Sequence, residues 1–203
     1  MATNNLIFTR RGFGIGLVGG AAALALPFAA QALTVDEASA LVNKAVGEVN
    51  NVINSGKSEA AMIGDFERVF SRYADVPVIA RSALGPAAKK ASKAQMDAFT
   101  KAYQGYLARK YGRRFREFIG SEIVVTGAKP VKSYYEVTTI AKLRGESPFD
   151  VRWHVSDKSG KSQFFNLIIE GVNMLGSERT EIGAMLDKRK GNIDALIEDL
   201  KKA

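Results

Sequence analysis

The sequence predicts an α+β domain in which helices pack on one face of a twisted four-stranded antiparallel sheet and enclose an apolar pocket. Two observations predict this fold. Apolar residues recur at helical steps of three and four in two regions, one before and one after the middle of the chain. Between these regions the chain is rich in β-branched and aromatic residues, which favour strands. The predicted helices span 34–53, 58–73, 77–84, 92–119, 177–190 and 192–201, and the predicted strands span 123–126, 134–143, 149–155 and 163–170.

Specific residues mark the starts of the helices. Thr34 with Glu37, and Ser92 with Gln95, form capping-box patterns. In such a box the hydroxyl accepts the backbone N–H three residues on, and the longer side chain returns a hydrogen bond to the capping residue. Pro77 opens the third helix, because the first turn of a helix needs no N–H from that position.

Alternation along the strands separates an apolar face from a polar face. The apolar face of 149–155 carries Phe149, Val151, Trp153 and Val155, and the polar face carries Asp150, Arg152 and His154. The same alternation in the next strand assigns Phe165, Leu167 and Ile169 to the apolar face. Short turns such as the one at 157–160 join the strands into an antiparallel meander, and the helices are expected to cover its apolar face.

The composition limits the classes of protein to which the chain can belong. Its 203 residues, 25% charged and 46% hydrophobic, suffice for one sizeable core. The lack of cysteine and the single histidine exclude disulfide frameworks, thiolate metal sites and sites built from several histidines. The formal net charge of +8 favours an anionic partner, whether nucleic acid, a lipid surface or an acidic protein.

Residues 1–32 have the order of a cleaved export signal. An arginine pair at 10–11 precedes an apolar run over 15–28, and Ala-Gln-Ala at 30–32 supplies a cleavage site. The arginine pair resembles a twin-arginine signal, which a receptor reads. A membrane anchor is the alternative, but the apolar run is shorter than the ~20 residues that span a bilayer. The remaining chain, 33–203, is expected to be a single domain in the periplasm.

No motif in the sequence gives positive evidence for catalysis. His154 lies on the polar strand face without a serine or threonine nearby in a recognisable nucleophile context, so a solvated strand residue is the simpler interpretation. The H-E-x-x-H, Walker and paired-carboxylate patterns do not occur. We therefore predict that the protein is not an enzyme and that it needs no cofactor and no metal.

The basic run from Arg109 to Arg116 interleaves cations with aromatic residues. The aromatic residues fall at helical spacing, so we expect them in the core rather than on a surface that stacks bases, and an exported protein seldom meets nucleic acid. The cations then form a solvated helix face or a docking surface for an acidic partner or an anionic lipid. The aromatic residues either pack as a solid core or line a cavity for an apolar ligand, and their spacing fits both.

Several segments follow one another in a recognisable order between residues 76 and 200. The most specific is E-G-V-N-M-L at 170–175, which leads to Arg179. The others include P-V-I-A-R-S-A-L-G at 77–85, S-K-A-Q at 92–95 and G-N-I-D-A-L-I at 191–197. In this order they resemble the MlaC family, also called the toluene-tolerance or ABC-transporter auxiliary family. The chain departs from the family pattern at 86–88, where a tryptophan is usual, and at 162–166, where W-x-V-x-D is usual.

The resemblance implies a periplasmic lipid shuttle. Family members hold acyl chains in a lipid pocket between sheet and helices, so phospholipid is a cargo and not a cofactor. The implied partners are an inner-membrane ABC transporter complex with its substrate-binding domain protein, and an outer-membrane lipoprotein complex; contact with a membrane surface is expected to be transient. The rival hypothesis is a cone-like α+β enzyme or a binding protein for another small apolar ligand, including a hopanoid-type lipid. An enzyme would place acids or bases on the apolar sheet face, where the sequence predicts none.

Periodicity and the resemblance together give the candidate site residues. The predicted pocket touches Val78, Phe99, Tyr103, Leu107, Tyr111, Val151, Trp153, Phe165, Leu167 and Val172. The predicted contacts for a lipid head group or a partner are Arg179, Arg113 and Arg116. Arg179 is expected at the start of a helix, where the helix dipole disfavours a cation. An acid such as Glu170, a lipid phosphate or a carboxylate of a partner should therefore pair with it.

Overall fold

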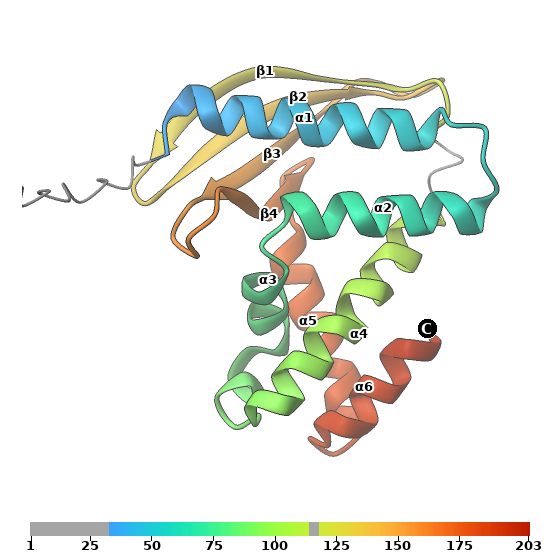
Figure 1. The fold of residues 1–203 in the computed structure, drawn as a ribbon, viewed down its shortest axis with the longest axis vertical. Coiled ribbons are helices and arrows are strands. Elements are labelled where there is room, and N and C mark those ends of the chain that lie inside the picture. Colours follow the sequence, from blue (N-terminus) through green and yellow to red (C-terminus); the bar gives the residue numbers. More distant parts are fainter. Residues whose placement is uncertain (1–32, 114–117) are drawn as a thin grey trace, which may run out of the picture. The chain divides into compact units, whose positions relative to one another are not determined.

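The computed structural model describes residues 33–113 and 118–203, and a helix or a strand lies on each predicted segment (Figure 1). The α+β class is thereby confirmed, while the predicted export signal lies outside the described residues. The helices before the sheet are α1 (Val35–Ile53), α2 (Glu59–Tyr73), α3 (Val76–Leu84), the 3-10 helix η1 (Gly85–Lys89) and α4 (Lys93–Gly112). The strands are β1 (Glu122–Val131), β2 (Tyr134–Lys142), β3 (Phe149–Ser156), β4 (Gln163–Ile169) and β5 (Val172–Asn173), followed by α5 (Met174–Lys188) and α6 (Ile193–Lys202).

The hydrogen bonds at two helix starts are those that the sequence predicts. Thr34 Oγ1 accepts the N–H of Glu37 at 3.2 Å, while the Glu37 carboxylate accepts the N–H of Thr34 at 2.8 Å. Ser92 and Gln95 exchange the same pair of bonds at 3.1 Å each. Both helices therefore begin where a side chain satisfies a backbone donor that the helix itself leaves free.

The sheet has five strands and not the four that the sequence predicts. All neighbours are antiparallel, in the order β1-β2-β3-β4-β5. The extra strand β5 pairs with the end of β4 after a two-residue turn, Glu170-Gly171, in which φ is +50° and +80°. Positive φ at both positions is the geometry of a tight hairpin turn. A strand of two residues is too short for alternation to reveal it.

Two predicted helix boundaries are wrong. The helix predicted over 92–119 ends as α4 at Gly112, and residues 114–117 lie outside the described part of the chain. The helix predicted from residue 177 begins three residues earlier, because Asn173 caps α5 by accepting the N–H of Gly176 at 3.1 Å. Asparagine is a strong capping residue, so Asn173 is the local sequence signal for this start.

A β-bulge in β4 changes which phenylalanine faces the core. Val155 pairs with Phe164 and His154 pairs with Asn166, so Phe165 is an extra residue on its strand. The Phe164 ring therefore lies inside, 5% exposed, with its centroid 5.1 Å from that of Trp153. The Phe165 ring lies 5.8 Å from the His154 ring on the other face. The assignment of Phe165 to the apolar face is wrong, because one inserted residue reverses the alternation.

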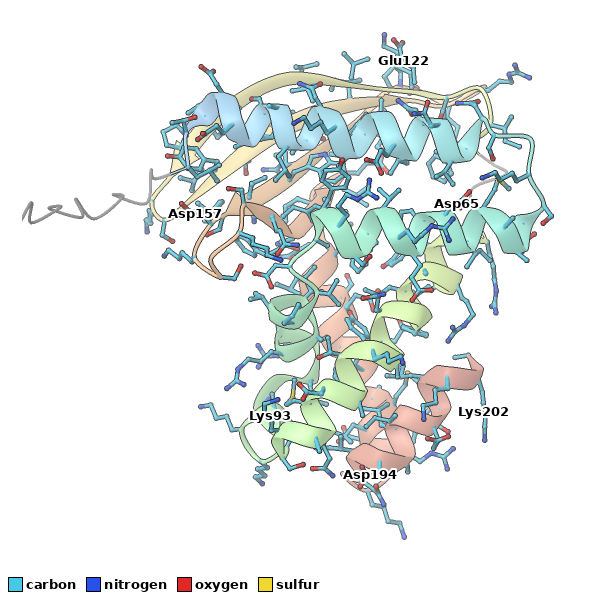
Figure 2. All side chains as sticks on the ribbon, in the orientation of Figure 1. Asp65, Lys93, Glu122, Asp157, Asp194 and Lys202 are labelled. Carbon is cyan, nitrogen blue, oxygen red and sulfur yellow. The ribbon has the colours of Figure 1, made fainter. Side chains whose placement is uncertain are left out.

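The helices form two groups relative to the sheet. Figure 1 shows α1 along the sheet, with α2 beside it, and α3 to α6 gathered on the far side of α2. α1 packs against β1, β2 and β3, while α5 and α3 pack against β4. Val42 of α1, Val137 of β2 and Val155 of β3 are fully buried in the first layer. In Figure 2 the side chains of Lys93, Glu122 and Lys202 lie at the outside.

Within the described residues, no helix is long and apolar enough to cross a membrane.

The bulge predicts unequal costs for two neighbouring substitutions. Phe164→Ala should lower the free energy of unfolding by about 3–5 kcal/mol, because it removes a buried ring from the core. Phe165→Ala, with a half-buried ring on the outer face, should cost much less. Urea unfolding measures the loss of unfolding free energy in each variant, provided that the m-value stays the same as in the wild type. Equal losses, or a larger loss at Phe165, would contradict the assigned register.

Candidate functional site

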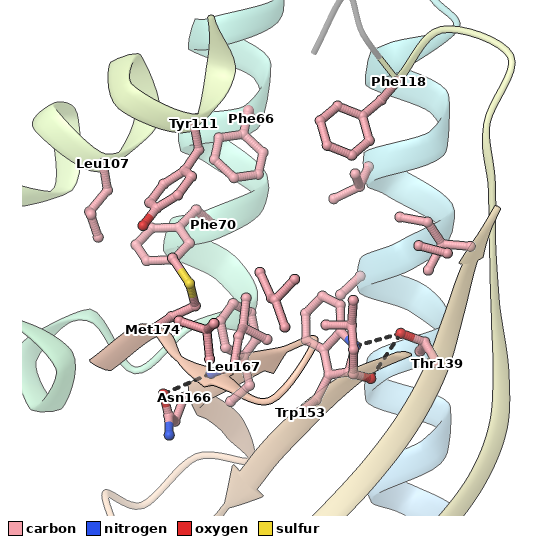
Figure 3. Close-up of a pocket in the computed structure, with 18 of the residues that line it drawn as sticks. Phe66, Phe70, Leu107, Tyr111, Phe118, Thr139, Trp153, Asn166, Leu167 and Met174 are labelled. Atoms are coloured by element: carbon pink, nitrogen blue, oxygen red, sulfur yellow. Dashed lines mark hydrogen bonds between the residues drawn. The ribbon is translucent and has the colours of Figure 1, made fainter. Parts of the chain in front are cut away.

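An apolar cavity of about 490 Å³ lies between the inner face of the sheet and helices α1, α2, α4 and α5. This volume falls within the range of ~300–1,000 Å³ typical of small-molecule sites. In the close-up of Figure 3, Tyr111, Phe70, Phe118 and Trp153 point from different elements toward one shared space. Part of the aromatic face of α4 therefore borders this space, at Tyr103 and Tyr111, while Phe99 and Tyr106 of the same helix belong to the packed core.

The sequence patterns explain two walls of the cavity. Strand alternation turns Val151 and Trp153 of β3 inward. Steps of four along α4 place Tyr103, Leu107 and Tyr111 on one helix face, which forms the opposite wall.

Sequence reasoning missed the walls that α1 and α2 contribute. These helices bring Ala45, Val49, Ile53, Phe66, Val69 and Phe70 to the cavity. Their helical spacing was visible in the sequence, but it is equally typical of a helix that packs on a solid core.

Eight of the ten predicted pocket residues border the cavity: Tyr103, Leu107, Tyr111, Val151, Trp153, Leu167, Val172 and also Phe165, although the Phe165 ring lies against Tyr134 and His154 on the outer face. Two do not. Val78 is 42% exposed on α3, because its neighbour Ile79 is the residue of that turn that faces inward. Phe99 is fully buried and stacks on Tyr103 with a centroid distance of 5.5 Å, so it belongs to the solid core one turn beyond the cavity.

The solvent-exposed part of the cavity lining lies at one end of the strands. Among the described residues that line it, the exposed ones are Glu146, Glu170 and Val172, the last 54% exposed. Glu146 belongs to the turn between β2 and β3, and the other two to the hairpin between β4 and β5. Antiparallel pairing brings these two turns to the same end of the sheet, where the N–H of Glu170 donates to the carbonyl of Asp150 at 3.2 Å.

Hydrogen bonds fix two parts of the wall in place. The indole Nε1 of Trp153 donates to Thr139 Oγ1 at 3.0 Å, and this hydroxyl donates to the Val151 carbonyl at 3.1 Å. Asn166 Oδ1 accepts the N–H groups of Leu167 at 2.9 Å and Leu175 at 3.1 Å, which joins β4 to the first turn of α5. Figure 3 shows the bonds of Trp153 and Thr139. Because these buried polar groups are hydrogen-bonded, they hold the apolar side chains around them in one arrangement.

A buried carboxylate, Glu178 of α5, also borders the cavity, and sequence reasoning missed it. It is 3% exposed and accepts hydrogen bonds from three side chains of α4. The donors are Lys110 Nζ at 2.7 Å, Tyr111 Oη at 2.6 Å and Tyr103 Oη at 3.3 Å. The expectation that the sheet face itself carries no acid or base still describes the strands, since Glu178 comes from a helix. The sequence gives no local sign of this role, because the three donors lie more than sixty residues away in the chain.

The charge state of this cluster follows from its contacts. Burial and the nearby Glu178 carboxylate raise the pKa of both Tyr103 and Tyr111, so both hydroxyls remain donors. Burial opposes the charge of Lys110, but hydrogen bonds to Glu178 and Glu181 outweigh it and raise the lysine pKa. Burial and a hydrogen bond to Glu181 raise the pKa of Tyr106 to about 12. The cluster is thus an ammonium held between two carboxylates, with neutral tyrosines around it.

The predicted head-group arginines lie at the surface. Arg179 is exposed in the second turn of α5 and not at its start, so the helix-dipole argument for it is wrong. Its guanidinium lies against Gly85 of η1, where an added Cβ would be 3.2 Å from Nε. In the described part of the chain no carboxylate, Glu170 included, forms an ion pair with it. Arg113 is exposed at the end of α4, and Arg116 lies outside the described residues.

His154 lies on the outer face of the sheet, as predicted, but it is not a solvated residue. Its side chain is 13% exposed, between the ring of Tyr134 at 4.5 Å and the carboxylate of Glu136, with Nε2 3.4 Å from Oε2. Burial lowers the pKa of His154 below its ordinary value of 6.5, and this effect exceeds the opposing attraction of Glu136.

His154 is the single histidine of the chain, so we predict that its protonation causes a distinct loss of folding stability as the pH falls. The unfolded chain takes up this proton at a higher pH than the folded chain does. Its contribution is therefore complete above pH 6.5 and is lost as the pH falls through the lowered folded value. His154→Gln should remove this part of the pH dependence of the melting temperature. Carboxylates such as Glu136, whose pKa lies below 4.5, titrate in a separate range. Identical profiles for variant and wild type would contradict the assignment.

Among the described residues, no group of three or more histidine, aspartate and glutamate side chains could hold a metal ion. Helices packed on an antiparallel sheet around an apolar cavity define an α+β protein with an internal ligand site. Within that class the chain belongs to the MlaC family, because the family model described as MlaC protein matches residues 43–202. The family consists of binding and transport proteins rather than enzymes.

The fold is similar to that of a solved structure, the phospholipid-binding protein from Ralstonia solanacearum in complex with a phospholipid. The TM-score is 0.69 at 16% sequence identity, and the match covers 81% of this chain and 95% of that one. At this identity the likeness shows a shared fold.

Proposed function

We propose that this protein is a periplasmic phospholipid shuttle that carries a lipid with its acyl chain in the cavity. The observation that carries the proposal is the apolar cavity itself, whose exposed lining residues lie at one end of the strands. Membership of the MlaC family supports it, as does the fold shared with a protein that was solved with a phospholipid bound. The lipid head group would lie at the mouth, near the turns that carry Glu146 and Glu170.

The energetics of acyl chains explain why such a carrier is needed and how it releases its cargo. Burial of each methylene is worth ~0.8 kcal/mol, so a free lipid does not leave a membrane for water at a useful rate. Ordering of the chain offsets part of this gain. The remainder still favours the bound state, so release requires a partner that opens the cavity. The proposed partners are an inner-membrane ABC transporter complex with its substrate-binding domain protein and an outer-membrane lipoprotein complex.

The proposed location follows from the first 32 residues. Their twin-arginine pattern would direct the chain to the periplasm, and the carrier would then be the domain formed by 33–203. We propose that the contact with membranes is transient and that it involves the arginines predicted to contact a head group or a partner, Arg113, Arg116 and Arg179.

The single tryptophan provides a direct test of lipid binding, because Trp153 lines the cavity. A phospholipid with brominated acyl chains should quench its fluorescence in a saturable manner. Ala45→Phe, which fills part of the cavity, should weaken the quenching, whereas Val78→Phe on the exposed side of α3 should not. Native mass spectrometry of the purified protein then identifies the lipid and separates phospholipid from a hopanoid-type ligand. Quenching equal in all three proteins would contradict a chain bound in this cavity.

Docking to an anionic membrane or an acidic partner should depend on the predicted arginines. Arg179→Ala and the Arg113→Ala/Arg116→Ala double variant should fold normally but transfer lipid between vesicles more slowly. Added salt should slow the wild type in the same way, because it screens exposed charges. The matched control is Lys158→Ala/Lys161→Ala, which removes two exposed cations in the turn between β3 and β4, away from α4 and α5. If all four proteins transfer lipid at one rate at low and high salt, the electrostatic docking model fails while the cavity assignment stands.

A further inference from the structure

The exposed rim of the cavity carries charges of both signs. Among the described lining residues three are exposed, and two of these, Glu146 and Glu170, are carboxylates. Arg144 lies in the same turn as Glu146, whose N–H closes the turn by donating to the Leu143 carbonyl at 3.4 Å. We call Arg144, Glu146 and Glu170 the rim charges. They combine two carboxylates with one guanidinium, whereas the whole chain is basic, with a formal net charge of +8.

The guanidinium of Arg144 connects two segments that both border the cavity. One is its own turn, in which the preceding residue, Leu143, lines the cavity. The other is 118–120, where Phe118 lines the cavity and Gly120 lies against the guanidinium. A Cβ added to Gly120 would be 3.2 Å from Nη2 of Arg144, so the lack of a side chain there leaves room for the cation. Arg144 is therefore a cation at the rim, although it does not line the cavity itself.

Within residues 33–113 and 118–203, the rim charges form no ion pair with another side chain. Charged neighbours at this end of the strands pair with one another instead. Lys142 Nζ lies 3.2 Å from a carboxylate oxygen of Glu122, and Arg152 Nε lies 3.3 Å from one of Asp150. In this part of the chain, the rim charges are therefore available to a ligand.

We propose that the rim charges select a lipid whose head group carries both a phosphodiester and a primary ammonium, as phosphatidylethanolamine does. This inference rests on the proposed function and names the class of cargo. The guanidinium of Arg144 binds the phosphate through its N–H donors. Glu146 and Glu170 bind the ammonium, which is joined to the phosphate by a short ethylene link. The head group of phosphatidylglycerol offers the phosphate alone, so it meets two carboxylates of its own sign.

Two single-chain lipids separate these contacts, because they share the acyl chain and the phosphate and differ only beyond it. They are myristoyl lysophosphatidylethanolamine and myristoyl lysophosphatidylglycerol, titrated by calorimetry into protein freed of co-purified lipid, at concentrations below those that form micelles. An exposed ion pair changes affinity by about twofold to fivefold. The wild type should therefore bind the ethanolamine lipid roughly fivefold more tightly, and added salt should reduce this preference by screening.

The two signs of charge predict different effects of substitution. Glu146→Gln/Glu170→Gln removes both partners of the ammonium and should reduce the preference to less than about twofold. Arg144→Gln removes the partner of the phosphate, which both lipids have. It should therefore weaken both by a similar factor, roughly threefold, and leave their ratio unchanged.

Matched controls come from the ion pairs at the same end of the strands. Glu122→Gln/Asp150→Asn changes the net charge as the double glutamate variant does, but its carboxylates are already paired and do not line the cavity. Lys142→Gln is the corresponding control for Arg144→Gln. Both controls should keep the affinities and the preference of the wild type.

The outcomes distinguish the inference from the proposed function. A preference that is lost in Glu146→Gln/Glu170→Gln but kept in its control supports the inference. Equal binding of the two lipids by the wild type, a preference that survives in the double variant, or a loss shared by the control overturns it while lipid binding stands. An Arg144→Gln variant that binds both lipids as the wild type does overturns the phosphate contact. If the wild type binds neither lipid, the proposed function fails, and the inference fails with it.

Discussion

A single carboxylate on α5 determines how the helices beneath the cavity are placed. Glu178 is buried, and a buried ion is tolerated only when donors surround it. All three of its donors come from α4, at residues 103, 110 and 111. The register between α4 and α5 is thereby fixed, because a shift of either helix would remove the partners of the charge. The inner wall of the cavity depends on that register.

Directional bonds of this kind explain how an apolar space of this size persists. Apolar packing has no preferred direction and favours closing any void. Thr139 holds the indole of Trp153, and Asn166 holds the first turn of α5 against β4. These bonds lie on separate walls, so that collapse of the cavity would break polar contacts for which no replacement is available nearby.

Sequence patterns predicted the fold more completely than the site. The helices and strands could be predicted because apolar residues repeat along each of them with the period of a helix or a strand. Capping residues such as Thr34 and Ser92 are local signals for helix starts. Features that break a periodicity were lost. The bulge at Phe165 reversed one strand face, the two-residue strand β5 was too short to detect, and the start of α5 was misplaced.

The cavity wall was predicted where it follows strand alternation or the aromatic face of α4, as at Trp153 and Leu107. Two kinds of wall residue could not be predicted. Apolar residues of α1 and α2, such as Phe66, look the same in sequence whether they face a core or a void. Glu178 carries no local signal, because its role depends on partners more than sixty residues away in the chain.

The entrance and the interior of the cavity are built from different kinds of structure. The turns at 144–148 and 170–171 form the entrance, whereas strands and helices form the walls. Turns accept changes of length and sequence that packed elements do not. Replacing the two turns is therefore a route to carriers that share one hydrocarbon compartment but present different chemistry to whatever meets them at the opening. In such chimaeras, recognition and storage would be separately designable properties of one small domain.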